Sequence, residues 1–395
     1  MSSAPAGLFF ELLDRCVVDA SIAFHTPITS RVAGRGPGAP TIAVMVRNER
    51  VFERTLALGN LGLAEAYMDS DFEMKEGTLA DLLTVLLRNR LDERVGDHPR
   101  LALRIALVRV RNLMRGGRRN VRAHYDQGDD LFECFLDPSM TYSCGYAVAE
   151  DDGLEALQWN KLDRICRKLR LAAGMRLLDI GCGFGGLLIH AARHYRVQGV
   201  GVTNSAAHRE GASRQIHAAG LGDRVTIMEV DFSRVSGRFD RIVSVGMLEH
   251  VPPRRYAAYF AAIAKQLAPR GLGLVHAIGC NAPRNVHDPF TQAYVFPDSH
   301  QPKLSDIARH LETNRLAILD VENIVRHYGY TVAQWLKRFQ ANQTTLDPVK
   351  YDARFRRMWE YYLSCGIAAA SASDSAVYQV LFTNDCTLDL PLARV

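Results

Sequence analysis

Apolar and polar positions follow two different periods through the middle of the chain. Short, almost continuous apolar runs alternate with stretches in which apolar residues recur every three or four positions. The apolar runs predict strands at 177–180, 197–202, 225–230, 239–245 and 271–278. The helical spacing predicts helices at 154–169, 187–193, 206–219 and 256–267. This alternation predicts a doubly wound, Rossmann-like α/β sheet, with ligands at the carboxyl ends of its strands.

The region before this sheet has a different pattern. A Gly/Pro-rich turn at 34–40 precedes a strand pattern at 41–46, and helical spacing follows at 49–58, 61–68 and 80–91. We therefore expect a smaller N-terminal α+β domain. It carries no catalytic constellation, so structural support and lipid binding both remain open as its role.

The stretch between Asp97 and Asp126 contains no acidic residue but many arginines, interleaved with apolar residues. The arginines are Arg100, Arg104, Arg109, Arg111, Arg115, Arg118, Arg119 and Arg122. Such a basic amphipathic face can lie on anionic phospholipid, each arginine contributing about 1 kcal/mol near the surface. No aromatic residue is interleaved for base stacking, so a nucleic-acid partner is not expected. A solvated helix that links two domains is the other interpretation.

Gly116-Gly117 ends this basic segment and marks the expected domain boundary. We expect an accessory or lipid-binding domain with a basic linker helix at 1–115 and a second domain at 116–395.

The first strand of the α/β domain runs into a glycine-rich turn from Asp179 to Gly186. Glycines at 181, 183 and 185 allow positive φ angles and close approach of the backbone to a ligand. A dinucleotide site would need a carboxylate after the second strand to hold a ribose, but that strand ends in Thr203-Asn204-Ser205. An acid just before the first glycine is instead typical of S-adenosylmethionine sites. The turn therefore predicts a class I methyltransferase domain.

Composition narrows the remaining choices. The 395 residues suffice for two domains, and 48% hydrophobic with 23% charged residues is ordinary for a soluble globular protein. No apolar run reaches the roughly 18 residues of a membrane span, and Glu11 and Asp14 argue against a signal peptide. The eight cysteines include no C-x-x-C pair, so we expect no zinc site and reduced thiols in a cytoplasm.

Several blocks of the sequence occur together in one order. They are HYDQGDDLFECFLDPSMTYSCGY, LLDIGCGFGGL, SVGMLEHV, LVHAIG, YVFP, DVENIVRHYGYT and RMWEYYLSC. With these blocks the chain resembles the cyclopropane-fatty-acyl-phospholipid synthase family, related to the mycolic acid cyclopropane synthases. The resemblance runs from about Arg119 to Val380, and Gly59–Tyr67 is similar to the N-terminal part of full-length bacterial members.

The resemblance implies methyl transfer from S-adenosylmethionine to the cis double bond of an unsaturated phospholipid acyl chain. A carbocation results, and the new methyl loses a proton as a cyclopropane ring closes. In the resembled enzymes a bound bicarbonate is the base. The residues that match its ligands are Cys144, Glu249, His276, the backbone at Ile278, and Tyr328. Taken alone, these residue types are as typical of a core thiol, a core histidine or a core phenol.

Cys365 matches a cysteine long proposed as active in the family. The mechanism gives this thiol no obvious task, so we favour a structural role for it.

The resemblance also implies the contacts of the cofactor. Tyr142 and Ser143 match the methionine end, and Asp179 is the acid before the glycines. The backbone of the glycine turn forms the cradle, and later strand ends complete the ribose and adenine pocket. The residues concerned are Gly181, Cys182, Gly183, Thr203, Asn204, His208, Asp231, Phe232 and Val245. For Asp231 a plain strand-end cap is the competing interpretation.

Some positions depart from the family pattern. Phe184 replaces a tryptophan, Asn204 a leucine, and His208 a glutamine expected to meet the nucleoside. A glycine pair is replaced by Asp298-Ser299-His300-Gln301, near the expected acyl entrance. These changes leave chain length, double-bond position and product open.

The resemblance implies a homodimer that works at the inner face of the membrane. A related methyltransferase that makes a methyl-branched unsaturated chain is the second hypothesis. A non-catalytic lipid- or cofactor-binding protein is the third.

Overall fold

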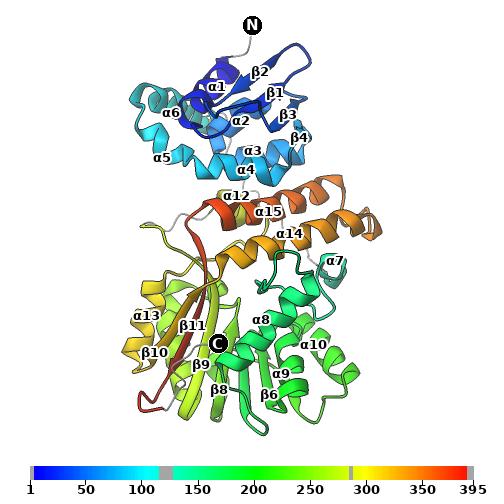
Figure 1. The fold of residues 1–395 in the computed structure, drawn as a ribbon, viewed down its shortest axis with the longest axis vertical. Coiled ribbons are helices and arrows are strands. Elements are labelled where there is room, and N and C mark those ends of the chain that lie inside the picture. The colour runs from blue at the N-terminus through cyan, green and yellow to red at the C-terminus, as the bar shows by residue number, and fades with distance from the viewer. Residues whose placement is uncertain (1–3, 115–127, 284–287, 389–395) are drawn as a thin grey trace. The chain divides into compact units, whose positions relative to one another are not determined.

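The computed structural model describes residues 4–114, 128–283 and 288–388. Backbone contacts divide the chain into two units (Figure 1). Unit 1 comprises Met1–Gly128, Val286–Pro297 and Leu336–Ser373, and unit 2 comprises Asp129–Asn285, Asp298–Trp335 and Asp374–Val395. Residues 286–297 and 336–373, expected in the second domain, thus group with unit 1. The boundary expected between 115 and 116 lies outside the described residues and stays a prediction.

Unit 1 contains a four-stranded sheet in the order β2-β1-β3-β4, in which only the β1–β3 pairing is parallel. Its strands are β1 (Ile22–His25), β2 (Ser30–Ala33), β3 (Ile42–Val46) and β4 (Phe72–Glu76). Its helices are α1 (Ala4–Cys16), α2 (Arg50–Leu58), α3 (Asn60–Met68), α4 (Leu79–Arg88), α5 (Leu91–Gly96), α6 (Pro99–Met114), α12 (Pro289–Tyr294), the short η4 (Gln343–Thr345) and α15 (Ala353–Ala372). The strand and the helices predicted between 41 and 91 are confirmed.

Aromatic side chains form the centre of the small sheet's core. Phe9 and Phe10 of α1, Phe24 of β1 and Phe52 of α2 pack ring against ring, with centroids 5.1 to 5.8 Å apart. Helix α15 packs against α3 and α4, and its Trp359 is fully buried. These contacts explain why α15, distant in sequence, belongs to this unit.

Unit 2 contains a seven-stranded sheet in the order β10-β11-β9-β8-β5-β6-β7. The strands are β5 (Arg176–Ile180), β6 (Gln198–Thr203), β7 (Val225–Glu229), β8 (Phe239–Val245), β9 (Leu267–Cys280), β10 (Ala317–Asn323) and β11 (Ser375–Thr383). Strands β5 to β9 pair in parallel, and β11 is antiparallel to both of its neighbours. The Rossmann-like arrangement predicted from the apolar runs is confirmed, whereas β10 and β11 were not predicted.

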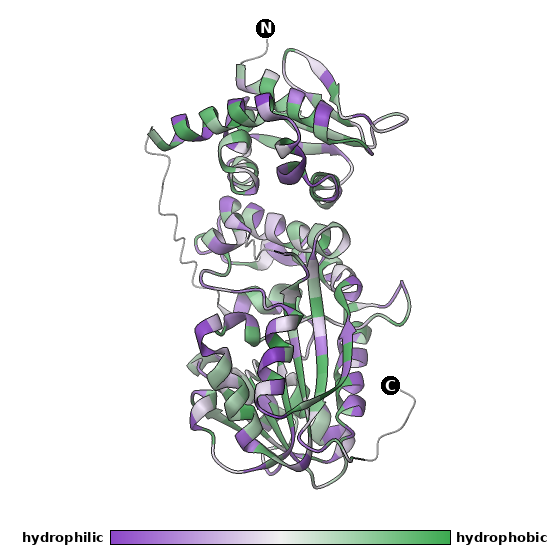
Figure 2. Ribbon diagram, turned by 90° about the vertical axis from the view of Figure 1, so that its left-hand side faces the viewer, coloured by the Kyte–Doolittle hydropathy of each residue, from purple (hydrophilic) through white to green (hydrophobic). Residues whose placement is uncertain are grey.

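The helices of unit 2 connect these strands. They are α7 (Asp129–Phe135), α8 (Leu154–Lys168), α9 (Gly186–Tyr195), α10 (Ala206–Ala218), η1 (Phe232–Arg234), η2 (Leu248–His250), η3 (Pro253–Arg255), α11 (Tyr256–Gln266) and α13 (Leu304–Thr313). The division between the units falls inside α14 (Val325–Asn342). Green and purple bands alternate along the helices in Figure 2, as expected for helices with one buried face. No helix in the described part is both long and apolar enough to cross a bilayer.

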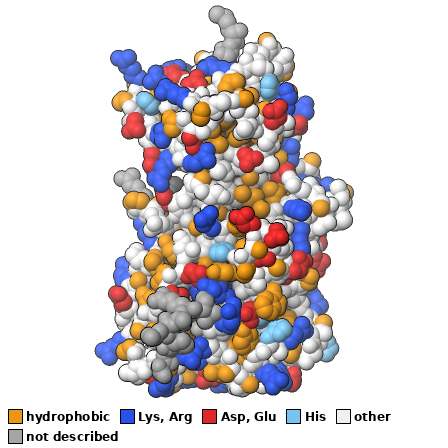
Figure 3. All heavy atoms as spheres, viewed as in Figure 1, with side chains coloured by type: hydrophobic (Ala, Val, Ile, Leu, Met, Phe, Trp, Pro, Cys, Tyr) orange, Lys and Arg blue, Asp and Glu red, His pale blue; other side chains and the backbone are white. Residues whose placement is uncertain are grey.

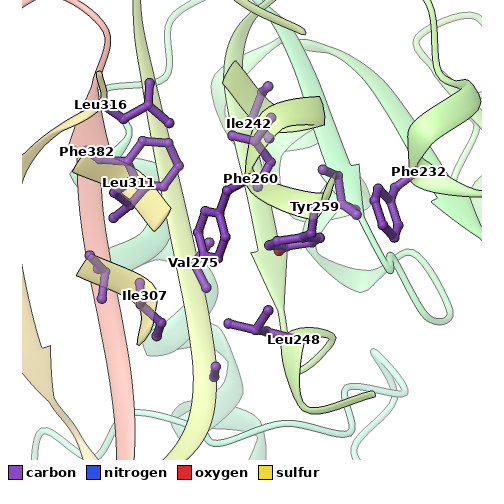
Figure 4. Close-up of a cluster of buried hydrophobic side chains, with 14 of the residues drawn as sticks. Phe232, Ile242, Leu248, Tyr259, Phe260, Val275, Ile307, Leu311, Leu316 and Phe382 are labelled. Carbon is purple, nitrogen blue, oxygen red and sulfur yellow. The ribbon is translucent and has the colours of Figure 1, made fainter. Parts of the chain in front are cut away.

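One core of unit 2 fills the space between the sheet and the helices α11 and α13. Phe260 of α11 lies beside Val275 of β9, and Tyr259 lies between Phe260 and Phe232 (Figure 4). Leu248 of η2 is completely buried in the same core. This burial fixes the turn after β8, which carries the first residue of the candidate site.

Candidate active site

Glu249 lies in η2, directly after β8, and its carboxyl group is buried. Its Oε1 accepts a hydrogen bond from the Ile278 amide at 2.5 Å, and Oε2 has no partner among the described residues. Burial raises the pKa of Glu249 to about 7, although the hydrogen bond from Ile278 acts against this shift. Near neutral pH about half of the molecules therefore carry a proton on this carboxyl group, and the neutral form can donate through its free oxygen.

His276 lies on β9, in register with Val245 of β8 and Gln379 of β11. Its Nδ1 lies 3.3 Å from the Gln379 side-chain nitrogen, and its Nε2 has no partner in the described part of the chain. Burial lowers the pKa of His276 to about 3, so the ring is neutral. With Gln379 as the donor to Nδ1, the ring carries its hydrogen on Nε2.

Three further predicted residues, Cys144, Ile278 and Tyr328, belong to one apolar cluster. Cys144, Ile324 and Val377 are buried together, and the side chains of Ile278 and Tyr328 pack against them. Ile278 and His276 are two positions apart on β9 and therefore face the same side of the sheet. The five residues that the resemblance matched to an oxyanion site thus come together in unit 2.

The Cys144 thiol is held by carbonyl groups. It lies 3.2 Å from the Gly145 carbonyl oxygen and 3.8 Å from that of Ile324. Burial raises the pKa of this thiol well above its usual range, although the charge of Lys161 acts against the shift. A protonated, apolar-packed thiol is no nucleophile, so Cys144 contributes through its place in the cluster.

Cys365 lies on α15 in unit 1. Its thiol lies 3.9 Å from the side-chain nitrogen of Asn60, which donates to Asp288 at 2.7 Å. Tyr361 in turn donates to the side-chain oxygen of Asn60 at 2.6 Å. Burial raises the pKa of the Cys365 thiol well above its usual range, so it is protonated. These bonds connect α3, α12 and α15, and we keep a structural role for Cys365.

The glycine turn after β5 has a backbone that residues with side chains would not readily adopt. Gly181 has a φ of 81°, and a Cβ atom there would lie 2.6 Å from Met247 Cγ. The amides of Gly181 and Cys182 donate to the Val202 carbonyl at 2.9 and 3.2 Å, which fixes the turn against β6. Gly183 also has a positive φ, of 53°. The turn has the tight shape that the sequence predicted.

Asp179, just before this turn, is 3% exposed. Its Oδ1 is buried without a hydrogen-bond partner among the residues described. Burial raises its pKa to about 7, and the charge of Lys161 acts against this shift. A carboxyl group with so few partners fits a site completed by a cationic ligand group.

Tyr142 and Ser143 are held by α8 and by aromatic rings. The Tyr142 ring lies 5.1 Å from Trp335 and 5.2 Å from Phe132, centroid to centroid. Ser143 accepts twice from α8: its carbonyl from Gln158 and its hydroxyl from Lys161, both at 2.9 Å. Neither Gln158 nor Lys161 was predicted from the sequence.

The segment after β6 is positioned by local hydrogen bonds. The Thr203 hydroxyl is buried and accepts from the Ser205 amide at 3.1 Å, whereas Asn204 is exposed. The His208 ring meets Phe184 edge to face, with centroids 4.9 Å apart. Two of the departures from the family pattern, Phe184 and His208, thus contact each other.

The comparison with protein families covers most of unit 2. The family model described as mycolic acid cyclopropane synthetase matches residues 114–380. The chain belongs to this family. It is an S-adenosylmethionine-dependent methyltransferase.

The relatives extend this similarity to the N-terminal part. The cyclopropane-fatty-acyl-phospholipid synthase of Escherichia coli K12 is 39% identical over 359 residues, which is 90% of this chain and 92% of that protein. The tuberculostearic acid methyltransferase of Mycobacterium tuberculosis is 31% identical over 401 residues, 96% of this chain and 91% of that protein. The solved structure of mycolic acid cyclopropane synthase CmaA1 with SAH and CTAB is 28% identical, with a TM-score of 0.62, and covers 67% of this chain and 97% of its own.

Two residues expected around the adenine have other contacts in this member of the family. Oδ1 of Asp231 accepts from the Ser233 amide at 3.0 Å, and its Oδ2 pairs with Arg255 at 3.0 Å. Asp231 thus has the contacts of a strand-end cap, which was the competing interpretation, and its contact with the nucleoside stays a prediction. Phe232 is buried with its ring against Tyr259 and Arg255, and it stays among the proposed adenine contacts (Figure 4). Val245, at the end of β8, stays among them.

The loop that replaces the family's glycine pair is bonded to the site. The amide of His300 donates to the Glu249 carbonyl at 2.7 Å, and the Cys280 amide donates to Pro302 at 3.2 Å. Asp298 has a φ of 69°, a conformation that glycine adopts more easily. The substitution therefore changes a loop that holds the backbone of Glu249.

The basic segment forms α6, with Leu101 and Ile105 on its buried side. Arg104 pairs with Glu11 at 2.5 Å, and Arg109 lies 3.5 Å from the Leu56 carbonyl oxygen. Exposed apolar residues recur along the outer side at helical spacing: Leu103, Leu107, Val110 and Met114. Figure 3 shows blue basic and orange apolar side chains next to each other at the upper left, where Figure 1 places α6.

Some predicted positions lie outside the described residues. They are Arg115, Arg118, Arg119, Arg122 and the motif His124-Tyr125-Asp126-Gln127. Within the described ranges, no group of three or more His, Cys, Asp and Glu side chains is arranged to hold a metal.

Proposed function

We propose that this methyltransferase converts a cis double bond of an unsaturated phospholipid acyl chain into a cyclopropane ring, with bicarbonate as the base. The observation that carries the proposal is the buried carboxyl group of Glu249, held by Ile278 on one oxygen and free on the other. A dry carboxyl group in this position fits chemistry beside a cation, which water would quench.

The residues fit S-adenosylmethionine, which supplies the methyl group. The open space at Gly183, where a Cβ atom would meet nothing within 4 Å, and the Asp179 oxygen without a partner are the two structural observations that support this fit. Tyr142 and Ser143 would hold the methionine end, and the backbone of Gly181, Cys182 and Gly183 would surround the sulfonium side. Thr203, Asn204, His208, Asp231, Phe232 and Val245 would follow the nucleoside.

The residues also fit a small oxyanion. Neutral Glu249 offers a donor on Oε2, and neutral His276 offers one on Nε2, and neither atom has a partner in the described structure. Two buried donors without acceptors are costly unless a ligand accepts from them. A bicarbonate ion bound there would take the proton that the new methyl group loses.

The protein's own residues would position the oxyanion, exclude water from the site and stabilise the charges that form there. The donors of Glu249 and His276 would orient the oxyanion and stabilise its charge beside the substrate cation. The rings of Tyr142, Trp335 and Tyr328 line up within 6.0 Å of each other, centroid to centroid between neighbours. Aromatic faces stabilise a nearby cation and exclude water.

We further propose that the protein meets its substrate at the membrane surface through α6. The outer stripe of Leu103, Leu107, Val110 and Met114 has the spacing of an interfacial helix. Arg100 and Arg111 flank it, are exposed, and form no ion pair with a described residue. An apolar stripe between free positive charges fits an anionic lipid surface. Location at the inner face of the membrane and the homodimer stay predictions.

A methyl-branched, unsaturated acyl chain is the second candidate product. The similarity to the tuberculostearic acid methyltransferase over 96% of the chain supports this second candidate. The altered loop also contacts the backbone of Glu249, the residue that we propose holds the oxyanion base.

Fatty acids from cells that express the protein test the proposal, analysed by mass spectrometry and proton NMR against an empty vector. We expect a gain of one CH₂ with upfield cyclopropane protons. The same gain in mass with a branched methyl and a retained double bond would favour the second candidate. Unchanged fatty acids, with folded protein that binds S-adenosylhomocysteine, would contradict both.

A further inference from the structure

Lys161 of α8 is a buried cation without a counter-ion. Its side chain is 1% exposed, and its ammonium group donates to the Ser143 hydroxyl at 2.9 Å. It forms no ion pair with any residue that the structure describes. Burial lowers the pKa of Lys161 to about 8, although Asp137, Cys144 and Asp179 act against the shift, so the group is mostly charged at neutral pH.

Lys168, two turns further along the same helix, shows what an ordinary buried lysine requires. It is 6% exposed and pairs with Glu322 at 2.6 Å and with Asp320 at 3.5 Å. A buried charge without such partners lowers the stability of the folded protein. The missing counter-ion of Lys161 is therefore a property that folding alone does not explain.

The bond between Lys161 and Ser143 has a fixed direction. An ammonium group can only donate, so the Ser143 oxygen accepts and must direct its own hydrogen elsewhere. No acceptor for this hydrogen occurs among the described residues. Ser143 therefore presents a hydroxyl donor whose oxygen is polarised by a buried positive charge.

Asp179 offers the opposite charge in the same region. Its Oδ1 has no partner, and the mutual effect of Lys161 and Asp179 on each other's pKa shows that they interact without forming an ion pair. A polarised donor and a free carboxyl group are complementary to a zwitterion, with its carboxylate at Ser143 and its ammonium at Asp179.

We propose that Lys161 is a positioning residue for the amino-acid end of S-adenosylmethionine, acting through the Ser143 hydroxyl on the carboxylate of that end. The proposal rests on the cofactor site proposed above. Gln158 supports the same arrangement, because it lies one turn before Lys161 and donates to the carbonyl groups of Thr141 and Ser143 at 3.3 and 2.9 Å. The two α8 side chains thus hold both the backbone and the hydroxyl of this loop.

Isothermal titration of the full chain with two probes tests this role. S-adenosylhomocysteine carries the amino-acid end, and 5′-methylthioadenosine lacks it. We expect K161M to weaken the binding of S-adenosylhomocysteine about tenfold or more. It should change the affinity for 5′-methylthioadenosine less than about twofold. S143A should have the same effects. The double variant should bind S-adenosylhomocysteine no more weakly than the weaker-binding single variant, because both substitutions remove the same contact.

Lys168→Met is the matched control, since it also removes a buried ammonium group from α8. It should lower the melting temperature and leave the ratio of the two affinities unchanged. Equal loss of both probes in K161M would show that Lys161 only supports the fold. Unchanged binding of S-adenosylhomocysteine, or additive effects in the double variant, would also overturn the inference. Failure of the unmodified protein to bind S-adenosylhomocysteine would instead contradict the proposed cofactor site.

Discussion

The amide of Ile278 donates to Oε1 of Glu249 at 2.5 Å and so connects the turn after β8 to the end of β9. This bond occupies one carboxyl oxygen and turns the other toward a region where it has no partner within the described structure. The parallel pairing of β8 with β9 brings Val245 beside His276. Two neighbouring strand ends thus supply both donors of the proposed oxyanion site, which agrees with the rule that ligands bind at such ends.

Glu249→Gln should lower turnover about 100-fold or more. The amide can still accept from Ile278 and fill the same volume, but it cannot exchange a proton with a bound oxyanion. The measurement is the rate of methyl transfer from labelled S-adenosylmethionine to lipid vesicles. Binding of S-adenosylhomocysteine should be unchanged and serves as the control for folding. Full turnover in a variant that binds normally would contradict the oxyanion proposal.

The same variant should be more stable than the unmodified protein at alkaline pH. Burial raises the pKa of Glu249 from 4.5 to about 7, so the folded state holds a proton that the unfolded chain releases. The carboxyl group therefore lowers the free energy of unfolding progressively as pH rises from about 4.5 to 7. At pH 8 the difference should approach about 3 kcal/mol in favour of Glu249→Gln, and at pH 5 it should be below about 1. Urea unfolding at both pH values measures it, and a difference independent of pH would refute the raised pKa.

The sequence predicted the central part of the sheet because its apolar runs are continuous. Leu177, Leu178 and Ile180 are all buried in β5, and no other period fits such a run. The edge strand β10 carries Asp320, Glu322 and Asn323, so its pattern is not that of a buried strand. The cause is tertiary, since Lys168 and Arg164 of α8 neutralise these acids.

The supporting residues of the site escaped prediction for a similar reason. Lys161 stands among Asp163, Arg164 and Arg167 in a helix that resembles a solvated surface in sequence. Gln379 contacts His276 across 103 positions of sequence, through a strand pairing that no local pattern indicates. The residues that lie in recognisable sequence motifs were predicted because their types are unusual at strand ends. Residues that hold them are ordinary until the fold is known.

Gln379→Leu should reduce turnover about twofold while the affinity for S-adenosylhomocysteine stays the same. The buried Gln379 amide donates to Nδ1 of His276 and thereby keeps the hydrogen on Nε2. Without this donor the two neutral forms of the ring become comparable, and half of the molecules present an acceptor to the oxyanion. Steady-state kinetics should show the loss in kcat rather than in KM for the cofactor. A change confined to KM would place Gln379 in cofactor binding instead.

His208→Gln should remove a pH dependence of cofactor binding. Burial lowers the pKa of His208 below 6.5, although Asp129 acts against the shift, so the ring becomes charged only in acid. The neutral ring can accept from a nucleoside hydroxyl, and the charged ring cannot. Affinity for S-adenosylhomocysteine should be constant above pH 6.5 and weaken below it, whereas the glutamine variant should bind equally across this range. Parallel pH profiles of both proteins would show that His208 does not contact the nucleoside.

Replacing the outer residues of α6 should detach the protein from lipid without affecting its fold. Leu103, Leu107 and Val110 are exposed, so a triple change to asparagine removes apolar area that contributes nothing to the core. Binding to vesicles of anionic phospholipid, measured by flotation, should fall about tenfold or more, and Arg100→Gln with Arg111→Gln should act in the same direction but only at low salt. Asparagine at Val148 and Val349, which are exposed apolar residues outside α6, is the matched control and should leave binding intact. If the α6 variants bind vesicles as well as the control does, α6 is a solvated helix and the protein reaches its lipid through another surface.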